Sequence, residues 1–252
     1  TTGTGSGKTE CFLIPIVDAL LREQEQGSLD EHGVRAIIIY PMNALANDQM
    51  KRMRNLLRNY PKITFGLYNG NTKHAQKDAL IEYRQIHAKD GASSQDPLKN
   101  ELISRETMQQ TPPHILITNY SMLEYMLLRP KDDKVFSSAR LRYIVLDEAH
   151  IYKGTTGMET SMLMRRLRAR LKATEHIQYI LTSATLGGKE ANRSIVEFGQ
   201  QLCGLTFKEE NIIRSVDASP VIEERNTYPI AFFGDVANGT LSVNDAFAKY
   251  AI

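Results

Sequence analysis

A glycine-rich segment near the start of the chain has the residue types needed to bind phosphate, in the order Thr2-Gly3-Thr4-Gly5-Ser6-Gly7-Lys8-Thr9. Gly5 and Gly7 lack a Cβ, so the backbone N–H groups around them can turn inward toward an anion. Lys8 would place its positive charge on the β and γ phosphates of a nucleotide, and Thr9 would offer a hydroxyl to Mg²⁺. The segment therefore predicts a phosphate-binding loop for ATP and Mg²⁺.

The residues after this loop favour that interpretation over a Gly/Ser/Thr-rich linker. The apolar run Phe12-Leu13-Ile14 follows at once, and a helix starting near Glu10 would point its positive N-terminal end at the same phosphates. The segment departs from the usual GxxxxGK[ST] pattern at its first position, which is Thr2 here. We expect ATP contacts from Thr4, Gly5, Ser6, Gly7, Lys8 and Thr9.

Two adjacent carboxylates, Asp147 and Glu148, follow the apolar run Tyr143-Ile144-Val145-Leu146. A carboxylate at the carboxyl end of a parallel strand lies where ligands bind in doubly wound folds. Asp147 would hold Mg²⁺ through its water shell, and Glu148 would orient and activate the attacking water. Any strand can end in Asp-Glu, so this motif has weight only together with the phosphate loop. The two motifs together predict an ATPase with Glu148 and Lys8 as its catalytic residues.

The segments that must position these motifs alternate between strand and helix. Val34–Tyr40 is a β-branched run closed by Pro41, as expected of a buried parallel strand, and Asn43 can cap the helix that follows. This alternation predicts an α/β fold with a mostly parallel sheet and helices on both faces. The other expected strands are Ile63–Leu67, His114–Thr118, Arg142–Leu146 and Ile177–Thr182, and the other expected helices are His74–Ala88, Ser121–Leu128, Gly157–Lys172 and Glu190–Cys203.

Two stretches lack this alternation. Residues 90–113 have a loop composition with one short helical stretch, so we expect an insertion there that is mobile or partly disordered. After Leu205 the pattern is irregular, with a strand expected at Tyr228–Phe233 and a final helix from about Val243. We therefore expect an ATP-binding domain over residues 1–205 and an extension or linker over 206–252. Since no strand precedes the phosphate loop, we also expect an N-terminally truncated fragment.

Composition excludes several other classes. The chain has 252 residues, 42% hydrophobic and 24% charged, with a net charge of +2, so it is no histone-like polycation. Its two cysteines, Cys11 and Cys203, have neither CxxC spacing nor a histidine at metal-ligand spacing, which disfavours a zinc site or a disulfide framework. No apolar run is long enough to span a bilayer, and the first residues do not resemble a signal peptide. We expect a cytoplasmic protein with reduced thiols and no membrane partner.

With both motifs placed, the chain resembles the DEAD/DEAH-box group of superfamily 2 helicases, and specifically their first RecA-like domain. Pro41-Met42-Asn43-Ala44-Leu45-Ala46-Asn47-Asp48-Gln49 matches motif Ia, and Thr118-Asn119-Tyr120-Ser121-Met122-Leu123 matches the segment near motifs Ib and Ic. Ser183-Ala184-Thr185 matches motif III, which couples the ATP state to movement between two domains in that family. The resemblance covers residues from Thr1 to about Gly188. It implies a RecA-like P-loop NTPase fold.

The resemblance also implies roles for individual residues. Coupling would fall to His150, Ser183 and Thr185. The backbone of a nucleic acid strand would be contacted through amides and hydroxyls, which position a strand without specifying its sequence. These contacts would come from Asn43, Asn71, Thr72, Thr118 and Asn119. For Asn43 and Asn119 the alternative is a simple helix cap, which for Asn43 is compatible with a strand contact.

Within the group, Tyr68-Asn69-Gly70-Asn71-Thr72 is similar to the Tyr-Asp-Gly-Asp-Thr segment of Lhr-like and MrfA-like bacterial DNA helicases. Two aspartates of that segment are asparagines here, which removes negative charge from the expected strand-binding edge. The resemblance favours DNA over RNA as the partner. Large bacterial helicases of this kind serve in DNA repair or phage defence, and the sequence does not choose between these pathways.

Two helices carry basic clusters. One cluster follows motif Ia and could border the bound strand, whereas the other is better explained as a solvated helix face or a dock for another domain. The first consists of Lys51, Arg52, Arg54 and Arg58, and the second of Arg165, Arg166, Arg168, Arg170 and Lys172.

Three functions are candidates for a chain with these motifs. The first is an ATP-driven DNA helicase or translocase, and the second is a nucleic-acid-gated ATPase clamp acting on DNA or RNA without processive unwinding. The third, a P-loop kinase or small-molecule ATPase, is disfavoured by the ordered helicase motifs. A second RecA-like domain, which the resemblance implies as a partner within the full-length chain, is not found in the sequence. We therefore expect this fragment to be nearly inactive in isolation.

Overall fold

The computed structural model describes residues 8–89, 96–171, 177–183, 189–214, 237–240, 245 and 249. The chain divides into two compact units, Thr1–Arg214 and Ser215–Ile252, and nearly all described residues belong to the first. The strand predicted at Tyr228–Phe233, and most of the helix predicted from Val243, lie outside the described residues. No helix in the described ranges is long and apolar enough to cross a membrane.

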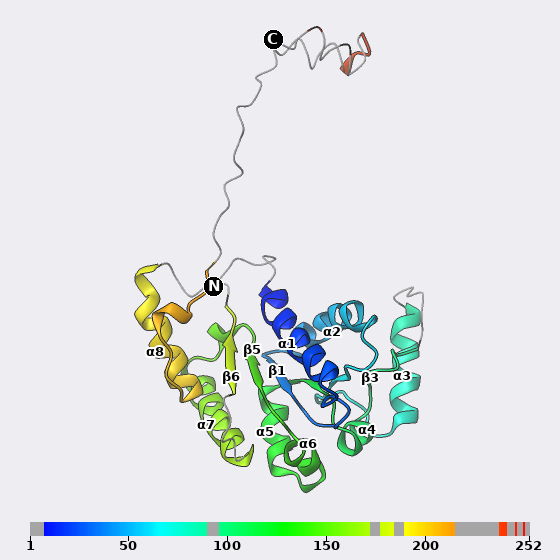
Figure 1. Cartoon of the computed structure of the whole chain (residues 1–252), viewed down its shortest axis with the longest axis vertical. Coiled ribbons are helices and arrows are strands. Elements are labelled where there is room, and N and C mark those ends of the chain that lie inside the picture. The colour runs from blue at the N-terminus through cyan, green and yellow to red at the C-terminus, as the bar shows by residue number, and fades with distance from the viewer. Residues whose placement is uncertain are drawn as a thin grey trace. The chain divides into compact units, whose positions relative to one another are not determined.

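The described residues of the first unit form a six-stranded sheet in the order β3-β2-β4-β1-β5-β6 (Figure 1). All neighbouring strands in it run parallel. Since parallel strands end at the same edge of a sheet, residues that follow them in the chain gather at that edge. The strands are β1 (Ala36–Tyr40), β2 (Phe65–Leu67), β3 (Glu101–Leu102), β4 (Ile115–Asn119), β5 (Tyr143–Leu146) and β6 (Gln178–Leu181).

Side chains of the central strands alternate between two hydrophobic cores, one on each face of the sheet. In β1, Ile37 and Ile39 face one core. Ala36, Ile38 and Tyr40 face the other. The predicted α/β fold, a parallel sheet with helices on both faces, is therefore confirmed (Figure 1). The first core is covered by α4 (Arg105–Gln110), α5 (Tyr120–Leu128), α6 (Asp133–Ser137), α7 (Gly154–Leu171) and α8 (Asn192–Cys203). The second core is covered by α1 (Lys8–Glu25) and α2 (Asn43–Leu57). The remaining helix, α3 (Gln76–Lys89), contacts α4.

Residues 96–113, expected to belong to a mobile or partly disordered insertion over 90–113, instead form part of the sheet and its cover. Strand β3 pairs with β2 at the sheet edge, and α4 follows it. The carboxylate of Glu101 is buried, where it accepts hydrogen bonds from Arg54 Nε at 2.9 Å and from Tyr83 Oη at 3.2 Å. A two-residue strand held by polar contacts to distant residues has no hydrophobic periodicity, so its sequence resembles a loop.

The first compact unit continues to Arg214, past the domain boundary expected at residue 205. Phe207 packs against the first core, and its carbonyl accepts a hydrogen bond from Gln200 Nε2 at 3.2 Å. Arg214 Nη2 donates to Asn192 Oδ1 at 2.7 Å. These contacts bind an irregular segment to α8, which local sequence pattern could not reveal.

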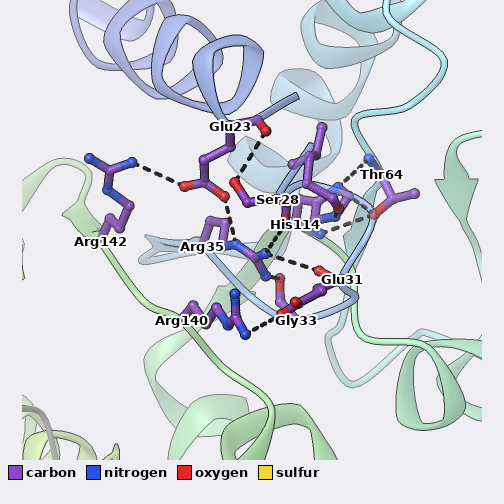
Figure 2. Close-up of polar contacts among 10 residues, drawn as sticks. Glu23, Ser28, Glu31, Gly33, Arg35, Thr64, His114, Arg140 and Arg142 are labelled. Atoms are coloured by element: carbon purple, nitrogen blue, oxygen red, sulfur yellow. Dashed lines mark hydrogen bonds and ion pairs between the residues drawn. The ribbon is translucent and has the colours of Figure 1, made fainter. Parts of the chain in front are cut away.

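The amino edge of the sheet is organised around a buried arginine, Arg35, which is 1% exposed (Figure 2). Its Nε donates to Glu23 Oε2 at 3.0 Å, which links the last turns of α1 to the start of β1. Next to it, His114 Nδ1 accepts a hydrogen bond from the backbone N–H of Thr64 at 3.1 Å. The proton of the neutral ring therefore lies on Nε2, which donates to the Leu29 carbonyl at 3.0 Å.

His114 should make the stability of the fold depend on pH. Burial, followed by the nearby Arg35 guanidinium, lowers the pKa of His114 to about 4. The unfolded chain, with an ordinary histidine pKa of about 6.5, therefore binds a proton that the folded chain rejects. The contribution of the neutral His114 to the free energy of unfolding is fully present above about pH 6.5 and is lost as pH falls toward 4. The loss amounts to about 3 kcal/mol.

The measurement is urea unfolding at several pH values for the unmodified protein and for His114→Asn. Asparagine keeps an acceptor near Thr64 but does not titrate, so the variant should be less stable at pH 7.5 yet lose less stability between pH 6.5 and 4. Equal losses in the two proteins would show that His114 is not the responsible group.

Candidate functional site at the carboxyl edge of the sheet

Residues from four predicted motifs meet at the carboxyl edge of the sheet. Asp147 and Glu148 follow β5, Ser183 lies just beyond the end of β6, and Asn119 is the last residue of β4. Lys8 begins α1. The parallel topology places the residues that follow β4, β5 and β6 at one edge, and Lys8 joins them through its contact with Glu148.

Lys8 and Glu148 lie in contact although they are far apart in the chain. Lys8 Nζ lies 3.5 Å from Glu148 Oε1, and both side chains are only partly exposed, at 14% and 20%. Next to Lys8, Thr9 is buried. The remaining predicted phosphate contacts, Thr4, Gly5, Ser6 and Gly7, lie outside the described residues.

Asp147 is the more deeply buried of the two carboxylates, at 7% exposed. Burial raises the pKa of Asp147, while a hydrogen bond from the Thr182 hydroxyl to its Oδ1 opposes that effect. Thr182 Oγ1 also accepts the backbone N–H of Glu148 at 3.2 Å. Thr182 was not among the predicted site residues, although it directly precedes the Ser183-Ala184-Thr185 motif.

The donor set fits Mg²⁺. A buried carboxylate is destabilised by loss of hydration, so a bound cation would favour its charged form. Asp147 and Thr9 offer oxygen atoms, the ligands that Mg²⁺ prefers, and Mg²⁺ sites commonly combine one or two carboxylates with substrate phosphates.

Glu148 has a strained backbone, with φ 48° and ψ 47°. Among the described residues it is the single non-glycine residue with positive φ. Such conformations carry a cost of about 1–3 kcal/mol and concentrate at functional sites. Here the left-handed turn ends β5 sharply, so that the Glu148 side chain lies beside Lys8.

The predicted coupling residues His150 and Ser183 are also brought together. His150 Nδ1 lies 3.2 Å from Ser183 Oγ. The same nitrogen lies 3.3 Å from Glu148 Oε2, an oxygen that is buried without a hydrogen bond. His150 thus bridges the carboxylate and the segment after β6. The third predicted coupling residue, Thr185, lies outside the described residues.

The asparagines assigned to nucleic acid form a pair at the ends of β1 and β4. Asn119 caps α5 by accepting the Met122 N–H at 2.7 Å, as the helix-cap alternative predicted. Its Nδ2 donates to Asn43 Oδ1 at 2.8 Å. The predicted cap by Asn43 is wrong, because Met42 occupies the N-cap position and Asn43 is the first helical residue.

The other three predicted strand contacts, Asn71, Thr72 and Thr118, differ in their exposure to solvent. Asn71 is exposed and Thr72 is half-buried in the turn after β2. Thr118 is fully buried, and its hydroxyl donates to the Tyr68 carbonyl at 2.7 Å. The assignment of Thr118 as a strand contact is therefore wrong, since its side chain points into the fold.

Several arginines of the two basic clusters bind other parts of the same unit. Arg54 pairs with the buried Glu101, and Arg52 lies 3.6 Å from Glu10. In the second cluster, Arg166 pairs with Glu124 of α5 and Arg170 pairs with Asp133 of α6. These arginines of α7 therefore tie helices together, whereas Lys172 lies outside the described residues.

The fold and this site define the class. A parallel α/β sheet with a lysine at the start of one helix, beside an Asp-Glu pair at a strand end, is the arrangement of a P-loop ATPase domain. The family model of the DEAD/DEAH box helicases matches residues 1–92 and 83–194 of this chain. The chain belongs to the DEAD/DEAH box helicase family, and it is a helicase motor domain with a RecA-like fold.

Individual relatives agree with this assignment. Druantia protein DruE of Escherichia coli is 32% identical over 86% of this chain and 16% of its own length. The uncharacterized ATP-dependent helicase YprA of Bacillus subtilis is 28% identical over 81% of this chain and 22% of its own length. The crystal structure of the DUF1998 helicase MrfA matches with a TM-score of 0.57 and 25% identity, over 86% of this chain and 27% of that one. The chain thus spans about a quarter or less of these proteins.

Proposed function

We propose that this chain is the ATP-binding motor domain of an ATP-dependent DNA helicase or translocase. The proposal depends on one observation, the convergence of Lys8, Asp147 and Glu148 at the same sheet edge as the Asn43–Asn119 pair. An ATPase site and a polar strand-binding surface that share one edge can pass a change at the first to the second.

In this proposal each residue of the ATPase site has one task. Lys8 neutralises charge on the β and γ phosphates, and Glu148 accepts a proton from the attacking water. Asp147 and Thr9 hold Mg²⁺, which supplies charge neutralisation at the phosphates when it is bound. In the structure Glu148 contacts Lys8, and this contact must loosen before Lys8 can bind phosphates. Phosphate groups near Lys8 would compete for that contact.

His150 and Ser183 couple this site to the rest of the motor. Their contact joins the residues after β5 to those after β6. A shift of Glu148 on hydrolysis would therefore be passed to Ser183 through His150. A second RecA-like domain of the full-length protein is the proposed recipient of that movement.

Nucleic acid would lie across the ends of β2, β4 and β1. Asn71 and Thr72 come from the turn after β2, Asn119 ends β4, and Asn43 begins α2 just after β1. One solved relative, MrfA, has been crystallised with DNA, and with DNA and AMPPNP. Another solved structure with the same fold shows the DEAD-box helicase Mss116 bound to single-stranded RNA. We favour DNA because of the similarity of Tyr68–Thr72 to DNA helicases.

A clamp that binds DNA or RNA without unwinding remains the second candidate function, because the same motifs serve clamps and helicases.

A cytoplasmic location is also proposed, since the two cysteines, Cys11 and Cys203, form no disulfide.

The test uses the full-length protein. We expect ATP hydrolysis to be stimulated more by single-stranded DNA than by single-stranded RNA, and a partly double-stranded DNA to be unwound or an ATP-dependent advance along one strand to be detected. Glu148→Gln serves as the control that removes turnover. Stimulation without strand displacement or movement would favour the clamp, and absence of stimulation by either nucleic acid would exclude both.

A further inference from the structure

The turn after β2, Asn69–Thr72, is closed by its own side chains. Asn69 is 2% exposed, and its Oδ1 accepts the N–H groups of Asn71 at 2.9 Å and Thr72 at 3.1 Å. The Thr72 hydroxyl donates to the Leu67 carbonyl at 2.8 Å and accepts the Asn69 N–H at 3.0 Å. These bonds fix the inner side of the turn and leave Asn71 exposed.

The outer side of the turn is held by a residue far along the chain. Arg105 Nη2 donates to the carbonyl oxygens of Asn69 at 2.9 Å and of Gly70 at 3.0 Å. Its backbone N–H donates to the Lys73 carbonyl at 2.9 Å. Arg105 therefore binds three backbone carbonyls of the turn and of the residue that follows it.

The guanidinium also rests on an aromatic ring that is itself immobilised. The Arg105 Cζ lies 5.6 Å from the centroid of the Tyr68 ring. The Tyr68 hydroxyl donates to Asp132 Oδ1 at 2.6 Å, and Gln109 Nε2 donates to the same oxygen at 2.7 Å. Asp132 is fully buried. The ring beneath Arg105 thus has little freedom to move.

Arginine suits this position better than lysine does. A planar guanidinium can stack on a ring and donate in fixed directions, whereas an ammonium group does neither. The Nη2 and the backbone N–H of Arg105 donate to carbonyls of the protein, and its Nε is buried without a hydrogen bond. This geometry suits a residue that shapes the turn.

We propose that Arg105 is a positioning residue that holds Asn71 and Thr72 in the geometry that binds a nucleic acid strand. The proposal rests on the proposed function of the turn as a strand contact. It assigns a purpose to residues 96–113, which place α4 where Arg105 can reach the turn. Loss of Arg105 should weaken strand binding without changing the ATP site.

The test measures, in the full-length protein, the concentration of single-stranded DNA that gives half-maximal ATP hydrolysis. For Arg105→Gln we expect this concentration to rise about 10- to 100-fold, because small misplacements of binding groups have effects of that size. The turnover rate at saturating DNA and the KM for ATP should stay near their original values. Arg84→Gln is the matched control, since Arg84 is a surface arginine of α3 paired with Asp96, and it should change none of these quantities.

Salt dependence separates positioning from direct contact. A side chain that touches a phosphate contributes about one unit to the slope of log affinity against log salt, and its loss reduces the slope. For Arg105→Gln we expect the slope to be unchanged. A slope reduced by about one would show that Arg105 binds the strand itself and would overturn the proposal.

Arg105→Lys guards against a folding defect in the glutamine variant. Lysine keeps the charge but can no longer stack and donate in the same directions. A positioning role therefore predicts weaker DNA binding in Arg105→Lys, whereas a role of charge alone predicts unchanged DNA binding. Normal DNA affinity in both variants would overturn this inference alone. An unmodified protein that DNA and RNA both fail to stimulate would instead overturn the proposed function, and this inference with it.

Discussion

Replacement of Glu148 by glutamine is expected to slow ATP turnover strongly in the full-length protein while ATP binding persists. Glutamine has nearly the same shape, but its amide cannot accept a proton from the attacking water. General base catalysis of this kind contributes about 10²–10⁴-fold in rate. Steady-state phosphate release measures the loss, and nucleotide titration measures the binding. Since Glu148→Gln also removes the carboxylate that holds Lys8 at 3.5 Å, ATP affinity should be equal or higher.

Lys8→Ala is the contrasting variant. It leaves Glu148 in place but removes the positive charge at the start of α1, and loss of a buried charged contact typically costs about 2–5 kcal/mol in binding. ATP affinity should therefore fall in Lys8→Ala and not in Glu148→Gln. Normal turnover in Glu148→Gln would exclude Glu148 as the base, and unchanged ATP affinity in Lys8→Ala would exclude the phosphate loop.

The polypeptide of residues 1–252, prepared alone, is expected to hydrolyse ATP about 10³–10⁵-fold more slowly than the full-length protein. An arginine supplied across the nucleotide from a second domain contributes that much in related P-loop enzymes. Under the proposed function, the second RecA-like domain supplies such a residue and half of the strand groove. DNA should bind weakly and in a salt-sensitive manner, and it should not stimulate hydrolysis.

Phosphate release from the purified polypeptide, with and without single-stranded DNA at low salt, tests this prediction. Glu148→Gln in the same polypeptide measures the background from contaminating ATPases. Robust DNA-stimulated turnover that disappears in this variant would show that residues 1–252 suffice for catalysis.

Some site residues were predictable because their chemistry depends on near neighbours in the chain. The turn to Asp147 and Glu148 follows a run of four apolar residues, and Lys8 follows glycines and opens an apolar helix. Their contact follows from parallel topology, since both motifs border the carboxyl edge of one sheet. Thr182 was not predictable, because a threonine at a strand end has no distinctive pattern. Its importance comes from the hydrogen bonds that it makes with Asp147 and Glu148.

The sequence by itself determined the class of this protein and its central strands, and it predicted the ATPase residues. Burial on both faces demands β-branched runs such as Ile37–Ile39, and phosphate binding demands glycines before Lys8, so both leave local patterns. Only the tertiary structure decided that β3 extends the sheet, that Asn43 pairs with Asn119, and that Arg105 holds the turn after β2. These features are polar contacts between residues distant in the chain. Hydrogen bonds of this kind depend on where the folded backbone brings two groups together, so no local periodicity in the sequence predicts them.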